Sequence, residues 1–254
     1  MHTRRLLVLA VALAAAGPVS ARPTVVAAVA SNFSRSAEQI AGLYAKSTGV
    51  EVSFSAGSSG KLYAQIENGA PFDVFLSADA ERPELLEQKG LAVAGSRFTY
   101  ALGRLVLWSA DPQLKGRDCQ KALTSGTFRH LSIANPKTAP YGMAAVAVLE
   151  KLGLPPATLG ERLVQGENIA QTLQFVATGS AALGFVARSQ LRGADAPAGT
   201  CRWDVPAGLH PPIAQQAVLL KRAEGNRAAA DFLRFLSSDA ARKLIREHGY
   251  DLSP

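Results

Sequence analysis

Metal-binding side chains are scarce in this chain of 254 residues. It has two cysteines and four histidines. The spacing of the cysteines matches no zinc or redox motif, and the histidines form no cluster of ligands. The sequence therefore predicts no metal centre with direct protein ligands.

Blocks of like charge and long apolar runs are also missing from most of the chain. Lysine and arginine are scattered, without the basic and aromatic pattern of a nucleic-acid-binding surface, so we expect no nucleic-acid partner. Beyond the first residues, no apolar stretch approaches the roughly 20 residues that a membrane-spanning helix needs.

The N-terminus has the composition of an export signal. Arg4 and Arg5 precede the apolar run 6–16, and small residues lead up to Ala21. We expect residues 1–21 to be a signal peptide cleaved after Ala21, against the alternatives of a membrane anchor or a buried first helix. Cleavage removes the two arginines, so the formal net charge falls from +7 to +5.

Export would place Cys119 and Cys201 in an oxidising compartment. We favour a structural disulfide over two free thiols. The sequence does not show whether the two Cα atoms lie close enough to be bridged.

The mature chain alternates strand-like and helix-like segments, which is typical of an α/β fold. Apolar patterns predict strands at 24–30, 50–54, 74–76, 131–134, 182–186 and 216–220. Helical patterns follow the first two strands and end at Gly49 and Gly69, and two helices close the chain.

The segment 98–108 is long enough to leave one domain and enter another. A second crossing is expected near Ile213, after a stretch rich in proline, glycine and alanine. The expected division is lobe 1 at 22–100 plus 213–254 and lobe 2 at 101–212, with a single domain as the alternative.

Small polar residues stand where strands give way to helices. Ser31 and Asn32 follow the first strand, and taken alone they are best interpreted as an N-cap. Ser59 lies in a Ser/Gly turn before an amphipathic helix. Unpaired N–H groups and the dipole at a helix start attract anions, so this turn is an anion-binding candidate, weighed evenly against an ordinary turn.

The same turn fits neither a phosphate loop nor a nucleophile elbow. A phosphate loop needs glycine at Ser55 and Ser or Thr at Leu62, and an elbow needs glycine at Lys61. No histidine and acid suggest themselves as partners that would activate Ser58 or Ser59. We expect a binding protein rather than an enzyme, with a secreted serine hydrolase as the alternative.

Two later helix starts offer further donors. Tyr141 and Ile169 can each present a backbone N–H, although a packed loop residue is the simpler interpretation of either one. Ligands of open α/β sheets bind outside the carboxyl ends of the strands, where such helix starts can converge. Asp73 and Asp79 are expected to brace loops, because a carboxylate would repel an anion.

Five segments resemble the periplasmic molybdate-binding proteins that serve ABC importers. They are AVASNF at 28–33, GSSGKLYAQIENGAPFDVFLSADAERPE at 57–84, GSRFTYALGRLVLWS at 95–109, NPKTAPYG at 135–142 and LGFVA at 183–187. They occur in the expected order over essentially the whole mature chain. The resemblance implies a two-lobed type II periplasmic-binding-protein fold, with an interdomain cleft that closes on an oxyanion.

The resemblance also implies a set of ligand contacts. They fall on Ser31, Asn32, Ser59, Tyr141 and Ile169. The sequence departs from other members at Ala187, where they carry a tyrosine donor; in the branch that this chain resembles, Asn32 and Tyr141 appear instead.

The implied ligand is molybdate or tungstate, with no cofactor and with molybdenum present only inside the oxyanion. The implied partner is an ABC permease of the inner membrane, served from the periplasm by a monomer. Receptors for another tetrahedral oxyanion, such as sulfate or thiosulfate, are the alternative among binding proteins.

Overall fold

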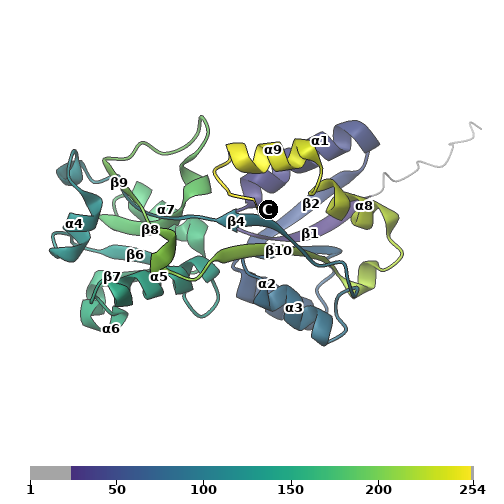
Figure 1. Cartoon of the computed structure of the whole chain (residues 1–254), viewed down its shortest axis with the longest axis horizontal. Coiled ribbons are helices and arrows are strands. Elements are labelled where there is room, and N and C mark those ends of the chain that lie inside the picture. Colours follow the sequence, from purple (N-terminus) through teal and green to yellow (C-terminus); the bar gives the residue numbers. More distant parts are fainter. Residues whose placement is uncertain (1–23, 253–254) are drawn as a thin grey trace, which may run out of the picture.

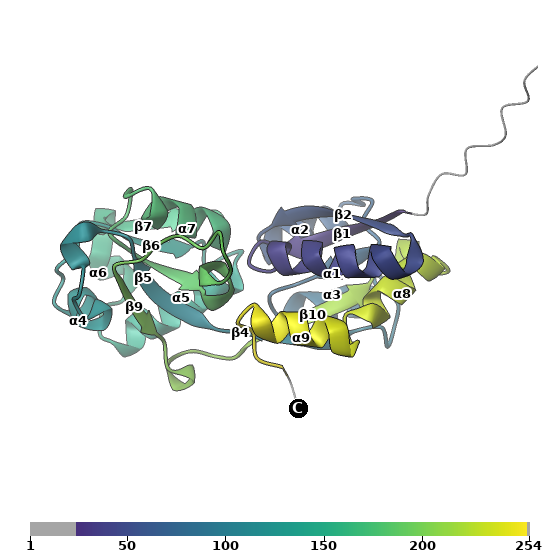
Figure 2. The same cartoon turned by 90° about the horizontal axis from the view of Figure 1, so that it is seen from above.

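The computed structural model describes residues 24–252, so the expected signal peptide and its cleavage after Ala21 lie outside the described residues. Two five-stranded sheets lie side by side, each covered by helices (Figures 1 and 2). Within residues 24–252, no helix combines the length and the apolar character that crossing a membrane requires.

The elements alternate along the chain as the sequence predicts. The strands are β1 (Thr24–Ala30), β2 (Glu51–Gly57), β3 (Val74–Leu76), β4 (Phe98–Gly103), β5 (Leu105–Ser109), β6 (Leu131–Ala134), β7 (Leu163–Gly166), β8 (Leu183–Ala187), β9 (Cys201–Asp204) and β10 (Ile213–Leu219). The helices are α1 (Ser34–Thr48), α2 (Ser59–Glu67), α3 (Glu81–Gln88), α4 (Cys119–Thr124), α5 (Pro140–Lys151), α6 (Pro156–Leu159), α7 (Ile169–Ala177), α8 (Arg227–Phe235) and α9 (Asp239–Glu247).

The first sheet has the strand order β2-β1-β3-β10-β4. Strand β1 pairs in parallel with β2 and β3, whereas β10 runs antiparallel to β3 and β4. The carboxyl ends of β1, β2 and β3 therefore meet at one edge of the sheet. Helices α1, α8 and α9 pack on one face, and α2 and α3 pack on the other.

The second sheet has the strand order β7-β6-β8-β5-β9. Strand β6 is parallel to β7 and β8, and β5 is antiparallel to β8 and β9. The ends of β6 and β7 lead toward α5 and α7, so this sheet also presents helix starts at one edge.

The chain passes between the sheets twice, which Figure 2 shows clearly. Only Arg104 separates β4 of the first sheet from β5 of the second, so the segment expected at 98–108 is two strands. The chain returns from β9 to β10. Strand β10 begins at Ile213, whereas the sequence predicted that it would begin at Gln216. The division into lobes at 100/101 and 212/213 stays a prediction, and β4 continues its pairing with β10 to Gly103.

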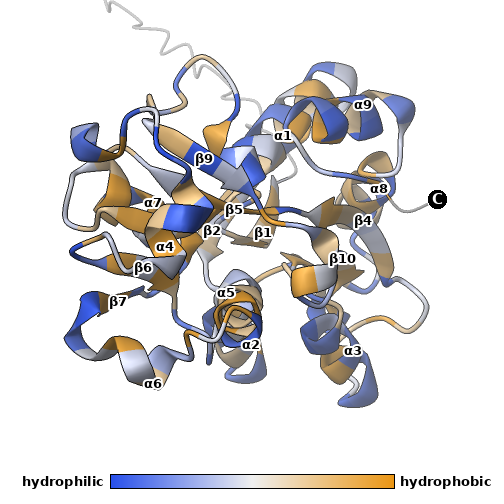
Figure 3. Cartoon of the chain, turned by 60° about the vertical axis from the view of Figure 1, so that its left-hand side comes forward, coloured by the Kyte–Doolittle hydropathy of each residue, from blue (hydrophilic) through white to orange (hydrophobic). Residues whose placement is uncertain are grey.

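Apolar spacing explains why the helices dock where they do. In α1, Ala37, Ile40, Ala41 and Tyr44 recur every three or four residues, and all four are buried. Gly49 ends the helix with a φ of 73°, a conformation that glycine adopts without strain, and its N–H bonds to the Ala45 carbonyl at 2.8 Å. Figure 3 shows apolar strands in the interior and polar residues on the outward faces of the helices.

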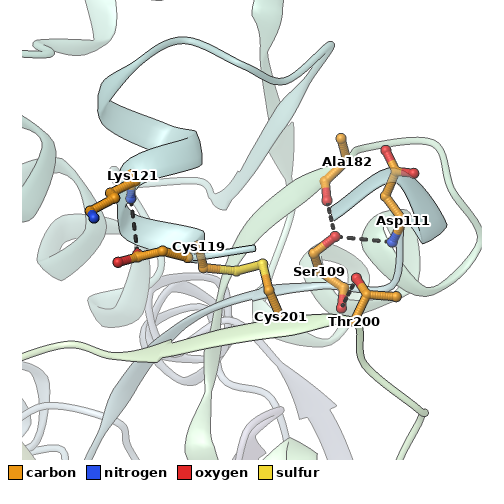
Figure 4. Close-up of a disulfide and its surroundings, with 8 residues drawn as sticks. Ser109, Asp111, Cys119, Lys121, Ala182, Thr200 and Cys201 are labelled. Atoms are coloured by element: carbon orange, nitrogen blue, oxygen red, sulfur yellow. Dashed lines mark hydrogen bonds between the residues drawn. A yellow bond between two sulfur atoms is a disulfide. The ribbon is translucent and has the colours of Figure 1, made fainter. Parts of the chain in front are cut away.

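A disulfide joins Cys119, at the start of α4, to Cys201, at the start of the edge strand β9 (Figure 4). The two Cα atoms are 5.5 Å apart. The disulfide favoured over two free thiols is therefore confirmed. It lies in the second sheet's half of the molecule, and neither cysteine lines the cavity described below.

Candidate functional site

A small cavity lies between the two sheets. Its walls are the residues that follow β1, β2 and β3 on one side and the first turns of α5 and α7 on the other. The five residues expected to contact a ligand all line it: Ser31, Asn32, Ser59, Tyr141 and Ile169. Its volume is about 10 Å³, which is about that of one water-sized sphere.

Ser31 and Asn32 do not cap a helix, contrary to the expectation from sequence. Helix α1 begins at Ser34, and its N-cap position is Phe33. Ser31 and Asn32 instead form the turn after β1, which places both at the cavity. The Ser31 N–H donates to the Gly57 carbonyl at 2.9 Å. The hydroxyl is therefore the donor of Ser31 that remains available to a ligand.

The side chain of Asn32 forms hydrogen bonds with residues behind the cavity. Its Nδ2 donates to Gln215 Oε1 at 2.9 Å and to the Tyr250 hydroxyl at 3.1 Å. Its Oδ1 is buried and has no partner among the described residues. The backbone N–H is then the free donor of Asn32, since none of the hydrogen bonds within residues 24–252 uses it.

Ser59 is almost fully buried at the start of α2. Its Oγ accepts a hydrogen bond from the Ala78 N–H at 2.9 Å. This bond fixes the rotamer and leaves the hydroxyl proton free to be donated. The Ser59 N–H belongs to the first turn, where no intrahelical carbonyl is available. The neighbouring Ser58 Oγ is buried without a partner in the described part of the chain.

The helix starts on the opposite wall leave two more N–H groups free. The Asn168 side chain caps α7 by accepting from the N–H groups of Ala170 at 3.0 Å and Gln171 at 3.1 Å. Ile169 lies between the cap and these two residues, and its N–H receives no such partner. In α5, Tyr141 is likewise in the first turn, after Pro140 at its first position.

The ring of Tyr141 lies behind the wall. Its hydroxyl accepts from Gln215 Nε2 at 3.3 Å and approaches Gly103 so closely that a Cβ there would lie 2.3 Å away. Burial raises the pKa of the Tyr141 hydroxyl well above its usual value, and the nearby Tyr250 adds to the effect. The hydroxyl therefore stays protonated at neutral pH.

The lining of the cavity contains no charged side chain. Three serines and several helix-start N–H groups line it, and the helix dipoles add positive potential. Such a wall suits a small anion that only accepts hydrogen bonds. Within residues 24–252, no group of three or more His, Cys, Asp or Glu side chains is placed to hold a metal ion.

One family of known proteins matches nearly all of the described residues. The profile of the family described as bacterial extracellular solute-binding proteins matches residues 25–251. The chain belongs to this family. Its members bind solutes rather than transform them, so the alternative of a serine hydrolase is dropped.

Two relatives carry a more specific name. Molybdate-binding protein ModA of Azotobacter vinelandii is 52% identical over 225 residues, which cover 89% of this chain and 88% of that protein. ModA of Rhodobacter capsulatus is 48% identical over 226 residues, covering 89% and 87%.

A solved structure, the periplasmic molybdate-binding protein of Azotobacter vinelandii, matches with a TM-score of 0.85 and 44% identity. The match covers 91% of this chain and all of that one. The expected α/β, two-lobed periplasmic-binding-protein fold is thereby confirmed.

Buried polar residues behind the cavity hold its lining residues in place through hydrogen bonds. The sequence did not predict this role for them. Gln215 is fully buried on β10 and reaches Asn32, Tyr100 and Tyr141. Tyr250 donates to the Asn32 carbonyl at 2.6 Å. The available signal was Gln215 itself, a polar residue at an inward position of an alternating strand, but the strand was expected to begin one residue later.

The two acidic residues near the site brace loops, as predicted. Asp73 accepts from the Val26 N–H at 2.9 Å and from Arg222 at 3.0 Å. Asp79 accepts from the Ser77 hydroxyl and the Arg82 N–H and forms an ion pair with the Arg82 guanidinium. Neither carboxylate lines the cavity.

Proposed function

We propose that this protein captures molybdate, and tungstate equally, between its two lobes and delivers the anion to an ABC permease. The observation that carries the proposal is the convergence of free, uncharged donors from both sheets on one cavity. The names of the two relatives from Azotobacter vinelandii and Rhodobacter capsulatus support molybdate as the ligand.

The donors available for the anion are hydroxyls and backbone N–H groups. We assign the hydroxyls to Ser31 and Ser59, and the N–H groups to Asn32, Ser59, Tyr141 and Ile169. We call these six groups the donor cage. In this assignment Asn32 and Tyr141 contribute their backbones, while their side chains hold the wall through Gln215.

A buried dianion needs such a cage because a charge without partners is very unfavourable inside a protein. Six donors can serve four oxygens, and three helix starts add favourable dipoles. No lysine or arginine is required. A fully deprotonated oxyanion presents only acceptors, whereas a protonated phosphate would direct an O–H at a cage made mostly of backbone N–H groups, which cannot accept it.

Size is the second basis of selectivity. Molybdate and tungstate are nearly the same size, so one cage holds both, and the smaller sulfate would leave some donors unsatisfied.

The remaining parts of the proposal concern the cell. Cleavage after Ala21 releases a monomer into the periplasm, where it carries its anion to the permease of the inner membrane. Sulfate or thiosulfate remains the second candidate ligand, because these anions have the same tetrahedral shape.

Thermal unfolding with single anions tests the proposal. A ligand that binds only the folded protein raises its free energy of unfolding by about 2.7 kcal/mol at a concentration of 100 Kd. Molybdate and tungstate should raise the melting temperature strongly, and sulfate at the same concentration should leave it unchanged. A shift with sulfate alone would contradict the proposal.

A further inference from the structure

The rim of the cavity contains a direct contact between two backbones. The N–H of Gly60, in the first turn of α2, donates to the carbonyl oxygen of Thr138 at 2.8 Å. Gly60 follows Ser59, and Thr138 precedes the first turn of α5, so the contact joins the two walls. Neither Gly60 nor Thr138 lines the cavity itself.

No side chain fits at Gly60 in this arrangement. A Cβ built there would lie 2.9 Å from the Thr138 Cα and 3.0 Å from the Thr138 carbonyl oxygen. Carbon atoms in favourable contact stay about 3.5–4.0 Å apart. The obstructing atoms are backbone atoms of a turn in which the N–H groups of Thr138 and Ala139 both bond to the Asn135 carbonyl. They cannot rotate away as a side chain would.

The obstruction arises only when the walls meet. Of the three atoms nearest to this Cβ, the one that belongs to the same wall is an Arg82 guanidinium nitrogen at 3.2 Å. That nitrogen ends a long side chain, which can shift by a few tenths of an ångström. Thr138 belongs to the opposite wall, so a methyl group at residue 60 is tolerated when the walls are apart and excluded when they touch.

The backbone conformation at residue 60 does not require glycine. Gly60 lies in a helix and is not among the glycines with positive φ. Alanine would favour the helix more than glycine does. What requires the missing side chain is the approach of the opposite backbone.

We propose that Gly60 is a positioning residue for anion binding: its missing side chain sets how closely the two walls close, and closure sets the affinity. This inference rests on the proposed function. The nearby pair of Lys61 and Glu167 also joins the walls, at 2.9 Å, but both side chains are about half exposed. Such a surface pair contributes little.

The test compares Gly60→Ala with Gly42→Ala by calorimetric titration with sodium molybdate. Gly42 lies in the middle of α1, and a Cβ there would have nothing within 4 Å. Overpacking of the rim should weaken molybdate binding by Gly60→Ala about ten- to a hundredfold. Gly42→Ala should bind like the parent protein.

Two further measurements distinguish a block to closure from damage to the fold. Without ligand, both variants should melt at or above the parent's temperature, because alanine favours both helices. In small-angle scattering, saturating molybdate should make the parent and Gly42→Ala more compact than Gly60→Ala.

The inference is overturned if Gly60→Ala binds molybdate like the parent or if it lowers the melting temperature of the ligand-free protein. A parent protein that binds no molybdate contradicts the proposed function itself, whatever the variants do. A parent that binds while both glycine variants remain unaffected contradicts only the role of Gly60.

Discussion

Asn32 and Gln215 are 183 residues apart in the sequence, and their side chains share a 2.9 Å hydrogen bond behind the candidate site. The same Gln215 amide reaches Tyr141 on the opposite wall at 3.3 Å. One fully buried side chain therefore connects a residue of each wall. Because β10 is also the strand by which the chain returns to the first sheet, this connection lies at the crossing between the two halves.

Replacing Gln215 should affect both stability and binding. Gln215→Leu removes the acceptor of Asn32 and Tyr100 and the donor to Tyr141. Each buried polar group left unpaired is destabilising by roughly 1–3 kcal/mol, so denaturant unfolding should show a clear loss and molybdate affinity should fall. Gln216→Leu is the matched control, because Gln216 is only partly buried and forms its side-chain hydrogen bonds with Arg97 and Thr99 instead of with the residues behind the cavity. A larger loss with Gln216→Leu would contradict this role.

Removing the Ser59 hydroxyl should weaken molybdate binding, and it should also lower the free energy of unfolding by about 1–3 kcal/mol because the buried Ala78 N–H loses its acceptor. Ser59→Ala keeps the backbone N–H but leaves one oxygen of the anion short of a donor. A hydrogen bond to a charged group contributes roughly 1.5–3 kcal/mol, so affinity measured by calorimetry should drop about ten- to a hundredfold. Ser55→Ala, within β2 and away from the cavity, should bind normally. Unchanged binding by Ser59→Ala would show that the first wall is wrongly assigned.

The disulfide should matter for stability and not for binding. Replacing both Cys119 and Cys201 with alanine removes a cross-link between residues separated by 82 positions. The free energy of unfolding should fall by about 2–4 kcal/mol, as is typical for such bonds. Molybdate affinity at 25 °C should remain that of the parent. A large loss of affinity in the folded variant would mean that α4 and β9 influence the cavity.

His248 should make the folded protein sensitive to mild acid. Burial, aided by Arg35, lowers the pKa of its imidazole below its ordinary value of about 6.5, while Glu247 opposes the shift. The unfolded state then binds more protons than the folded state just below pH 6.5, so stability is fully present above this pH and falls as the pH drops toward the folded pKa.

The imidazole contacts Ser36 Oγ at 2.8 Å and Gln39 Oε1 at 3.1 Å, both on α1. His248→Gln should therefore flatten the dependence of the melting temperature on pH just below pH 6.5. The parent and the variant should show parallel curves above pH 7. Identical curves at all pH values would exclude His248 as the titrating group.

Local patterns were sufficient to predict much of this structure. The apolar spacing of α1, the stop at Gly49 and the strands β1, β3 and β6 were evident because each depends on neighbouring residues. The turn after β1 was misread as a cap because the alternative depends on Gly57, which accepts the Ser31 N–H from another strand. Short elements such as α6 and β9 have too few residues to show a period.

Some residues of the candidate site could likewise be predicted from the sequence, and others could not. Ser59 and Ile169 stood out because a helix start leaves donors free whatever lies around it. Gln215, Tyr100 and Tyr250 were missed because their roles depend on contacts between residues more than a hundred positions apart. Sequence alone could also not say that Asn32 uses its side chain behind the wall.

The most direct test of the central claim is a calorimetric titration of the protein spanning residues 22–254, with molybdate, tungstate, sulfate and phosphate in turn. The account predicts one site per chain that binds molybdate and tungstate with similar affinity, and no measurable binding of sulfate or phosphate at comparable concentrations. Sulfate binding as tight as molybdate binding, or no binding of any of the four anions, would contradict it.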